Sequence, residues 1–219
     1  SAPGVGEIAF FNLPGSYTVT FTSNILNSAS IIEDGPVTFA LSGNSSSVTG
    51  SQGLNIGTTA GKTARLTLQN GRVGADTTLG AAVGSTGFLT MGNDTRLNGE
   101  LTIGNAGTGT LNMTGGAQIS DTSIFGDNTI GTSSTGNGTV NVSGLGTLWQ
   151  FQNLTVGRSG TGRLNITSGG VVSQLGGSDP TVIGSLAGSL GEVVVSGAGS
   201  QLNLTDALTI GGDGTGRLT

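Results

Sequence analysis

The chain has 219 residues and a formal net charge of −5, with only 9% charged residues and 43 glycines. Its seven basic residues are scattered and include a single lysine, Lys62, which excludes the basic stripe that nucleic-acid binding needs. No cysteine or histidine is present, so disulfides and imidazole bases are excluded. No apolar run is long enough to predict a membrane-spanning helix, yet recurring valine, isoleucine and leucine predict a buried core.

The first 53 residues differ in composition from the rest, because four of the seven phenylalanines fall here. Residues 17–21 (YTVTF) and 37–41 (VTFAL) alternate apolar and polar side chains, as half-buried strands do. We expect residues 1–53 to form the opening coils or a cap, with bulky aromatic side chains closing one end of a stack.

Residues 54–219 contain a repeat. Residues 101–116 read LTIGNAGTGTLNMTGG, and the pattern returns after 53 residues as LTVGRSGTGRLNITSGG and after a further 54 as LTIGGDGTGRLT. A related unit, IGTSSTGNGTVNVSGLG at 130–146, returns 53 residues later. With weaker copies included, units start near positions 54, 79, 101, 130, 154, 183 and 208.

Each unit holds short alternating segments separated by glycine and small polar residues. Apolar residues at every second position predict strands, and the Gly-Thr-Gly and Ser-Gly-Gly segments predict turns that need positive φ. The pattern favours an all-β, right-handed parallel β-helix (a β-solenoid) of about seven to nine coils with three short strands per coil. A β-propeller is the alternative, because the 53-residue superrepeat is close to the length of a blade.

The repeat motifs LTVGxxGTGxLNI and GxVxVSGxGS resemble the β-helix repeats of bacterial autotransporter passenger regions and of other repeat-rich bacterial surface proteins. The copies from position 101 onward carry the resemblance best, and it extends over residues 54–219. The resemblance implies a β-helix that is secreted or held at the cell surface. Passengers with this scaffold include adhesins, aggregation factors, proteases and esterases, so the resemblance implies no particular activity.

Three acids precede unit starts by three or four residues: Asp76, Asp127 and Asp179. They predict an acidic ridge, as in a carbohydrate-active β-helix enzyme, with carboxylates two coils apart separated by ~10 Å. The alternative is that each aspartate supports a turn through hydrogen bonds to its own backbone. The second interpretation is favoured, and no catalytic residue is expected.

Trp149 and Phe151 precede the strand expected at Leu154. The pair either stacks on a glycan from the surface or, as we favour, fills a wider part of the core. Asn112 and Asn165 hold equivalent positions in their units, which predicts a ladder of hydrogen-bonded amides more readily than glycosylated sequons.

We therefore expect an extracellular structural or adhesive β-solenoid, without catalysis and without a cofactor. A loop calcium ion is the one exception considered, because residues 211–216 (GGDGTG) faintly match a calcium-binding repeat. The last unit stops in mid-repeat, which predicts end-to-end self-association or continuation in a longer rod. Surface glycans or other cells are further expected contacts. A carbohydrate-active enzyme or a glycan-binding module is the alternative function.

Overall fold

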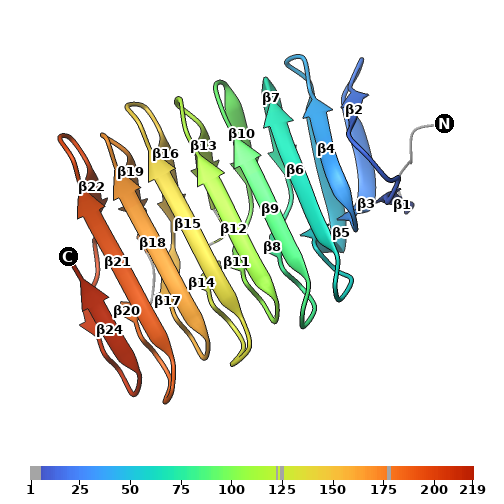
Figure 1. Ribbon diagram of the computed structural model, residues 1–219. Helices are drawn as coiled ribbons and strands as arrows, with labels where there is room; N and C mark the ends of the chain where they lie inside the picture. The colour runs from blue at the N-terminus through green and yellow to red at the C-terminus, as the bar shows by residue number, and fades with distance from the viewer. Residues whose placement is uncertain (1–5, 122, 124–125, 177–178) are drawn as a thin grey trace.

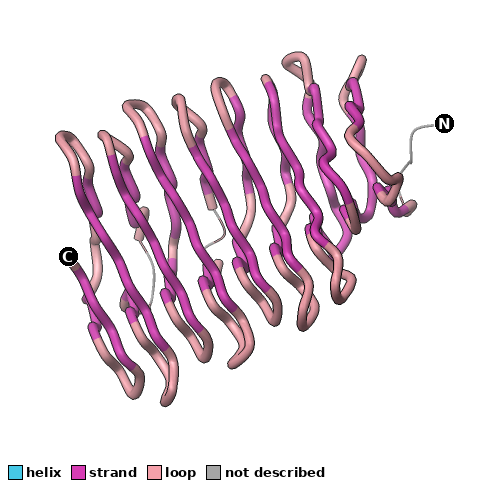
Figure 2. The backbone as a smooth tube through the Cα atoms, in the orientation of Figure 1, coloured by secondary structure: helices cyan, strands magenta, loops and turns pink. Residues whose placement is uncertain are grey.

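The computed structural model describes residues 6–121, 123, 126–176 and 179–219, and none of these lies in a helix (Figure 2). A membrane-crossing helix is accordingly not found in the described part of the chain. The strands are β1 (Ile8–Phe11), β2 (Tyr17–Thr20), β3 (Ile25–Ile32), β4 (Gly35–Ala40), β5 (Ser45–Ile56), β6 (Thr63–Gln69), β7 (Gly71–Gly74), β8 (Thr77–Leu79), β9 (Thr86–Met91), β10 (Thr95–Asn98), β11 (Leu101–Ile103), β12 (Thr108–Met113), β13 (Gln118–Ser120), β14 (Asp127–Ile130), β15 (Asn137–Ser143), β16 (Leu148–Phe151), β17 (Asn153–Val156), β18 (Thr161–Thr167), β19 (Val171–Gln174), β20 (Thr181–Ile183), β21 (Leu190–Ser196), β22 (Gln201–Asn203), β23 (Leu208–Ile210) and β24 (Thr215–Leu218).

The strands stack in parallel as a β-solenoid of about 8 turns (Figure 1). One 9-stranded sheet runs β2-β4-β6-β9-β12-β15-β18-β21-β24 along the whole stack. The other two strands of each regular coil, such as β13 and β14 after β12, belong to two legs that meet at the long strand β5. The predicted parallel β-helix with three strands per coil is confirmed, and the propeller alternative is wrong.

The strand register refines the predicted period. All of the predicted unit starts lie on the third strand of a coil, from β5 to β23. However, Leu101 lies opposite Thr77 and Asn128 opposite Leu154, so alternate units start two residues earlier than the sequence pattern suggests. The two kinds of unit therefore form equivalent coils. They look different in the sequence because the apolar residue taken as the unit start falls two positions later in alternate coils.

The core is a set of apolar ladders inside the coils. On the long sheet, Leu89, Leu111 and Val140 are in register on successive strands and are each fully buried. On the third leg, Ile103 and Ile130 continue a second ladder. Parallel neighbours are ~4.8 Å apart, which lets each branched side chain pack on the one below it. Burial of every second residue is thus the physical reason for the alternating sequence pattern.

Glycines at the corners are required for two different reasons, a positive φ at some positions and the space left by the missing Cβ at others. The positive φ is at Gly104 (68°), which follows β11, whereas the Gly107-Thr108-Gly109 segment predicted to need it has none. Gly109 is required for space instead, because a Cβ there would lie 2.3 Å from the backbone nitrogen of Gly104. The prediction for Gly-Thr-Gly was therefore right for the corner and wrong for the residues that provide the positive φ. The prediction for Ser-Gly-Gly is confirmed, since Ser168 and Gly169 have φ of 53° and 87°.

The N-terminal section belongs to the same stack. β2 pairs with β4, which pairs with β6, and β1 pairs with β3. The ring of Phe39 packs against those of Phe11 and Phe21, with centroids 5.0 and 5.2 Å apart. Phe11, Phe21 and Phe39 therefore fill the first coils, whereas Phe10 is 56% exposed. The predicted boundary at residue 53 falls inside β5.

Trp149 and Phe151 lie on β16, point into the coil and are both 0% exposed. Their rings are 6.0 Å apart and form part of the continuous core. This position matches the core-filling interpretation, and neither ring offers an exposed face for stacking on a sugar.

Candidate functional site

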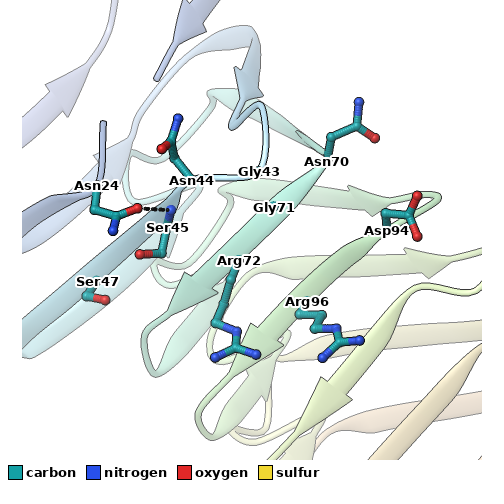
Figure 3. Close-up of a pocket in the computed structure, with 10 residues that line it drawn as sticks. All are labelled: Asn24, Gly43, Asn44, Ser45, Ser47, Asn70, Gly71, Arg72, Asp94 and Arg96. Atoms are coloured by element: carbon teal, nitrogen blue, oxygen red, sulfur yellow. Dashed lines mark hydrogen bonds between the residues drawn. The ribbon is translucent and has the colours of Figure 1, made fainter. Parts of the chain in front are cut away.

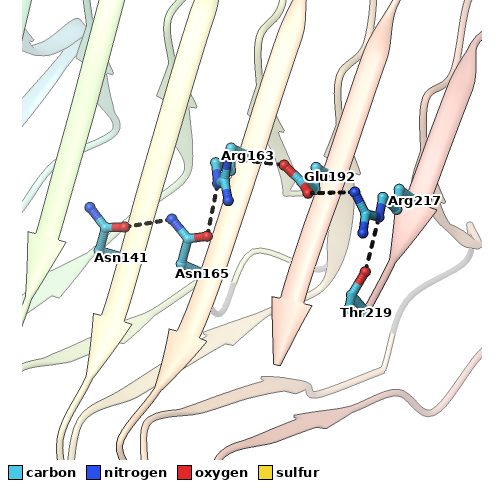
Figure 4. A network of polar contacts seen from close by, with 6 residues as sticks. All are labelled: Asn141, Arg163, Asn165, Glu192, Arg217 and Thr219. Atoms are coloured by element: carbon cyan, nitrogen blue, oxygen red, sulfur yellow. Dashed lines mark hydrogen bonds and ion pairs between the residues drawn. The ribbon is translucent and has the colours of Figure 1, made fainter. Parts of the chain in front are cut away.

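An asparagine ladder crosses the long sheet. Asn141 Nδ2 donates to Asn112 Oδ1, and Asn165 Nδ2 donates to Asn141 Oδ1, each at 2.7 Å. The ladder predicted from Asn112 and Asn165 is confirmed, with Asn141 between them. Its last oxygen also accepts a 3.0 Å hydrogen bond from Arg163 Nε (Figure 4). These amides hold successive coils in register.

A charged column continues this network towards the C-terminal side of the sheet. Glu192 lies in register between Arg163 and Arg217 and forms ion pairs of 3.1 and 3.7 Å with them (Figure 4). Two cations on one column are therefore separated by an anion. The arrangement joins three coils without leaving like charges on adjacent strands.

The predicted acidic ridge is formed only in part. Extending the pairing of β8, β11 and β14 places Glu100 between Asp76 and Asp127 on one column. Asn153 continues this column after Asp127, and extending the register of β17 with β20 places Pro180 next to Asn153. Asp179 therefore lies one residue outside the column. Asp76 and Asp127 are two coils apart as predicted. Glu100 was missed because it directly precedes its strand rather than lying three or four residues before a unit start.

Glu100 has the most perturbed environment on this column. Burial raises the pKa of the Glu100 carboxyl, and the negative charges of Asp76, Asp121 and Asp127 raise it further. Asp76 also has a structural role, since its Oδ1 accepts a 3.0 Å hydrogen bond from the backbone nitrogen of Glu100. A carboxyl with a raised pKa beside ionised carboxylates is one arrangement used for acid and base catalysis, and is also found in structural networks.

The fully buried Asp121 belongs to such a structural network. Its Oδ2 accepts a 2.8 Å hydrogen bond from Asn128 Nδ2, and Asn128 Oδ1 accepts one of 3.0 Å from the backbone nitrogen of Leu101. Asn128 is 1% exposed, so this amide joins neighbouring coils inside the protein. Nothing in the repeat pattern singles out Asn128, since the equivalent residues on adjacent coils are leucines.

A hollow with a volume of about 600 Å³ lies beside the second strands of the early coils (Figure 3). It is lined mostly by amides, hydroxyls and guanidinium groups: Asn24, Asn44, Ser45, Ser47, Asn70, Arg72, Asp94 and Arg96. Hydrogen bonds fix its rim, because Asn24 Oδ1 accepts from the nitrogen of Ser45 and Asn44 Nδ2 donates to the carbonyl of Phe21.

Arg72 on β7 and Arg96 on β10 are directly in register. Both side chains are exposed, and Figure 3 shows them on neighbouring strands at one side of the hollow. This pair was not predicted from the sequence, although GRVG at 71–74 and TRLN at 95–98 carry arginine at the same place in their strands. We refer to the hollow together with these two side chains as the arginine groove.

The described residues contain no group of three or more carboxylates arranged to hold a metal ion. Asp213, from the sequence that suggested a calcium loop, is exposed, and its backbone nitrogen donates to the carbonyl of Ser185. The calcium loop therefore stays a prediction.

No protein-family model, curated protein or solved structure matches this chain with significant similarity. The resemblance to autotransporter passengers consequently rests on the repeat motifs themselves.

Proposed function

We propose that this chain is an extracellular structural and adhesive β-solenoid, which works as a stiff scaffold and presents its surface to other molecules. The observation that carries the proposal is the continuous register of the 9-stranded sheet, in which each strand pairs with the next from β2 to β24. A stack of this kind gains stability from every interface between neighbouring coils, as repeat proteins do.

The polar side chains of the repeat support this function because many of them connect coils. The Asn112–Asn141–Asn165 ladder, the Glu192 column and the buried Asn128 amide each link residues more than 20 positions apart in sequence. The repeat motifs resemble those of bacterial surface proteins, and the chain has no cysteine and one lysine. This composition suits an exposed structural role, in which stability comes from regular packing rather than disulfides.

End-to-end self-association, or continuation in a longer rod, is part of the proposal. β22, β23 and β24 end the described sheets and have no described strand on their outer side. Beside them, a hollow of about 490 Å³ is lined by several leucines of the open core. Leu218, which lines this hollow, is 40% exposed, and Ile210 on β23 is 46% exposed. Either another copy of the chain or further coils of a longer rod would cover this apolar end and pair with its strand edges.

Sedimentation velocity over a range of concentrations tests this scaffold, together with electron microscopy. We expect concentration-dependent end-to-end assemblies, and we expect the double substitution Ile210→Lys and Leu218→Lys to abolish them by placing charges on the edge. The paired control is Leu145→Lys, at an 81% exposed leucine outside the open end. Monomers at every concentration, or equal loss in the control, would contradict end-to-end association.

A carbohydrate-active enzyme is the second candidate, and the in-register acids Asp76, Glu100 and Asp127 favour it. The strands of adjacent coils are ~4.8 Å apart, a spacing that allows in-register carboxylates to approach one another as closely as a glycosidase pair does. If the chain is such an enzyme, it shortens a polysaccharide, and Glu100→Gln removes that activity. The scaffold proposal expects no shortening.

A further inference from the structure

The arginine groove holds two positive charges that have no ion-pair partner among the described residues. Arg72 and Arg96 are on adjacent coils, whose strands are ~4.8 Å apart. The ion pairs in the described part of the chain are Lys62–Asp34, Arg163–Glu192 and Arg217–Glu192. Asp94 lines the groove but is not within ion-pair distance of either arginine.

The contrast with the Glu192 column shows that this arrangement is unusual for the chain. There, two arginines are separated by an in-register glutamate. Arg65 likewise has a partner, because its guanidinium lies 3.9 Å from the centre of the Phe88 ring. In the groove, two like charges lie side by side, which destabilises the free protein. A bound anion would remove that repulsion.

The groove is extended along the stack. A second hollow of about 230 Å³ shares Arg72 and Arg96 and continues over Asn98, Gln118, Ser120 and Gln150. The pairing of β7, β10, β13 and β16 places these polar side chains on successive coils. The two arginines therefore lie between two polar hollows that follow one another along the solenoid axis, as a site for a chain-like ligand requires.

The side chains indicate the class of ligand. A guanidinium group binds carboxylate and sulfate groups through paired hydrogen bonds. Amides and hydroxyls on either side donate to and accept from hydroxyl groups, which polysaccharides carry along their length. Single-stranded nucleic acid requires aromatic platforms in addition to cations, and no aromatic side chain lines either hollow.

We propose that the arginine groove binds an acidic polysaccharide, with Arg72 and Arg96 holding one carboxylate or sulfate group and the flanking amides holding neighbouring sugar hydroxyls. This site deepens the adhesive part of the proposed function and rests on it. The uronate and sulfate ester classes share the same anion chemistry, and the experiment separates them.

Binding is measured by isothermal titration calorimetry with polygalacturonate, dextran sulfate and uncharged dextran. We expect one or both acidic polymers to bind and dextran not to bind. Arg72→Gln and Arg96→Gln should each weaken binding about tenfold, the effect expected for losing hydrogen bonds to a charged group. Lysine at both positions keeps the charges but loses the paired hydrogen bonds of the guanidinium group. The affinity of this variant for the acidic polymer should therefore lie between those of the wild type and the glutamine variants.

The matched control is Arg158→Gln with Arg217→Gln, which removes the same two charges from elsewhere on the surface. The proposal is overturned if neither polymer binds, if the control loses as much affinity as the double variant Arg72→Gln with Arg96→Gln, or if DNA or phosphatidylglycerol vesicles bind the groove as tightly. Self-association tests the scaffold separately: polymer binding without assembly contradicts only the scaffold, and assembly without polymer binding contradicts only this site.

Discussion

Asn112 and Asn141 occupy the same position on adjacent coils, and the side-chain amide of Asn141 donates to the oxygen of Asn112 at 2.7 Å. Because Asn141 also accepts from Asn165, it makes two amide–amide hydrogen bonds and Asn112 makes one. Neighbouring coils are thus joined by side chains in addition to the backbone, and the number of bonds differs between positions in a way that unfolding experiments can detect.

The first prediction concerns this ladder. Asn141→Ala should lower the free energy of unfolding by about 1–3 kcal/mol and Asn112→Ala by about half as much, at a net 0.5–1.5 kcal/mol per hydrogen bond. Urea unfolding followed by fluorescence of Trp149, the single tryptophan, measures both. Asn203→Ala is the control, since its amide bonds only within its own strand. Equal effects at positions 112 and 141 would argue against a ladder.

The second prediction concerns the space at the corners. A Cβ at Gly138 would lie 2.2 Å from the carbonyl oxygen of Ile103, so Gly138→Ala should destabilise the fold by about 1–3 kcal/mol or more. Gly92 has open space around its Cβ position, and Gly92→Ala should be neutral or stabilise by up to about 1 kcal/mol. Thermal unfolding of both variants checks the order, and a tolerated alanine at 138 would contradict the close packing.

The third prediction concerns the buried Asn128. Leucine at this position leaves Asp121 without its amide donor and the backbone nitrogen of Leu101 without its acceptor. We expect a loss of about 1–3 kcal/mol per buried group left unsatisfied. Asn98→Leu is the comparison, because Asn98 is exposed and should change stability by less than about 0.5 kcal/mol. Denaturation midpoints that fall equally in both variants would count against the network.

The fourth prediction follows from the raised pKa of Glu100. Near neutral pH the ionised carboxylate is less favourable in the folded chain than in the unfolded chain, so Glu100→Gln should stabilise the protein there. The gain should disappear below the ordinary pKa of 4.5, where Glu100 is protonated in both states. The measurement is the urea midpoint as a function of pH, and a pH-independent gain would contradict the assigned cause.

Asp34→Asn gives the opposite control. The hydrogen bond from Lys62 lowers the pKa of Asp34, so its contribution is present at neutral pH and is lost as the pH falls. This variant should therefore be destabilised near neutral pH, although the pair is exposed and its effect is small. If Asp34→Asn instead stabilised the protein at neutral pH, the ion pair with Lys62 would not be a favourable one.

The sequence predicted the parts of the fold that depend on periodicity. Alternation in the segments around Leu111 and Ile103, repeated along the chain, is sufficient to indicate stacked parallel strands. Equivalent positions in repeated units also predicted the asparagine ladder, because in-register side chains must touch. Such contacts can be predicted only where the repeats align without ambiguity.

The remaining features depend on the register between unequal coils. The two-residue offset of alternate units hid the column that joins Glu100 to Asp76 and Asp127. Asp179 was included because it precedes its unit start by four residues, whereas Asp76 and Asp127 precede theirs by three and Pro180 takes the equivalent place. The arginine groove was missed for a related reason, since Arg72 and Arg96 belong to the weakly repeated second leg. The sequence also does not show that a side chain at position 109 would be too close to its neighbours, because the nearest atom is the backbone nitrogen of Gly104 at the corner.

The most direct test of the scaffold function is the fate of a polysaccharide held by the chain. Polygalacturonate and dextran sulfate are incubated with the wild-type protein and with Glu100→Gln, and polymer length is measured by size-exclusion chromatography with light scattering. The scaffold proposal predicts that both polymers are recovered at their original length with either protein. Shortening by the wild-type chain that disappears in Glu100→Gln would contradict it and establish the acidic column as a catalytic site.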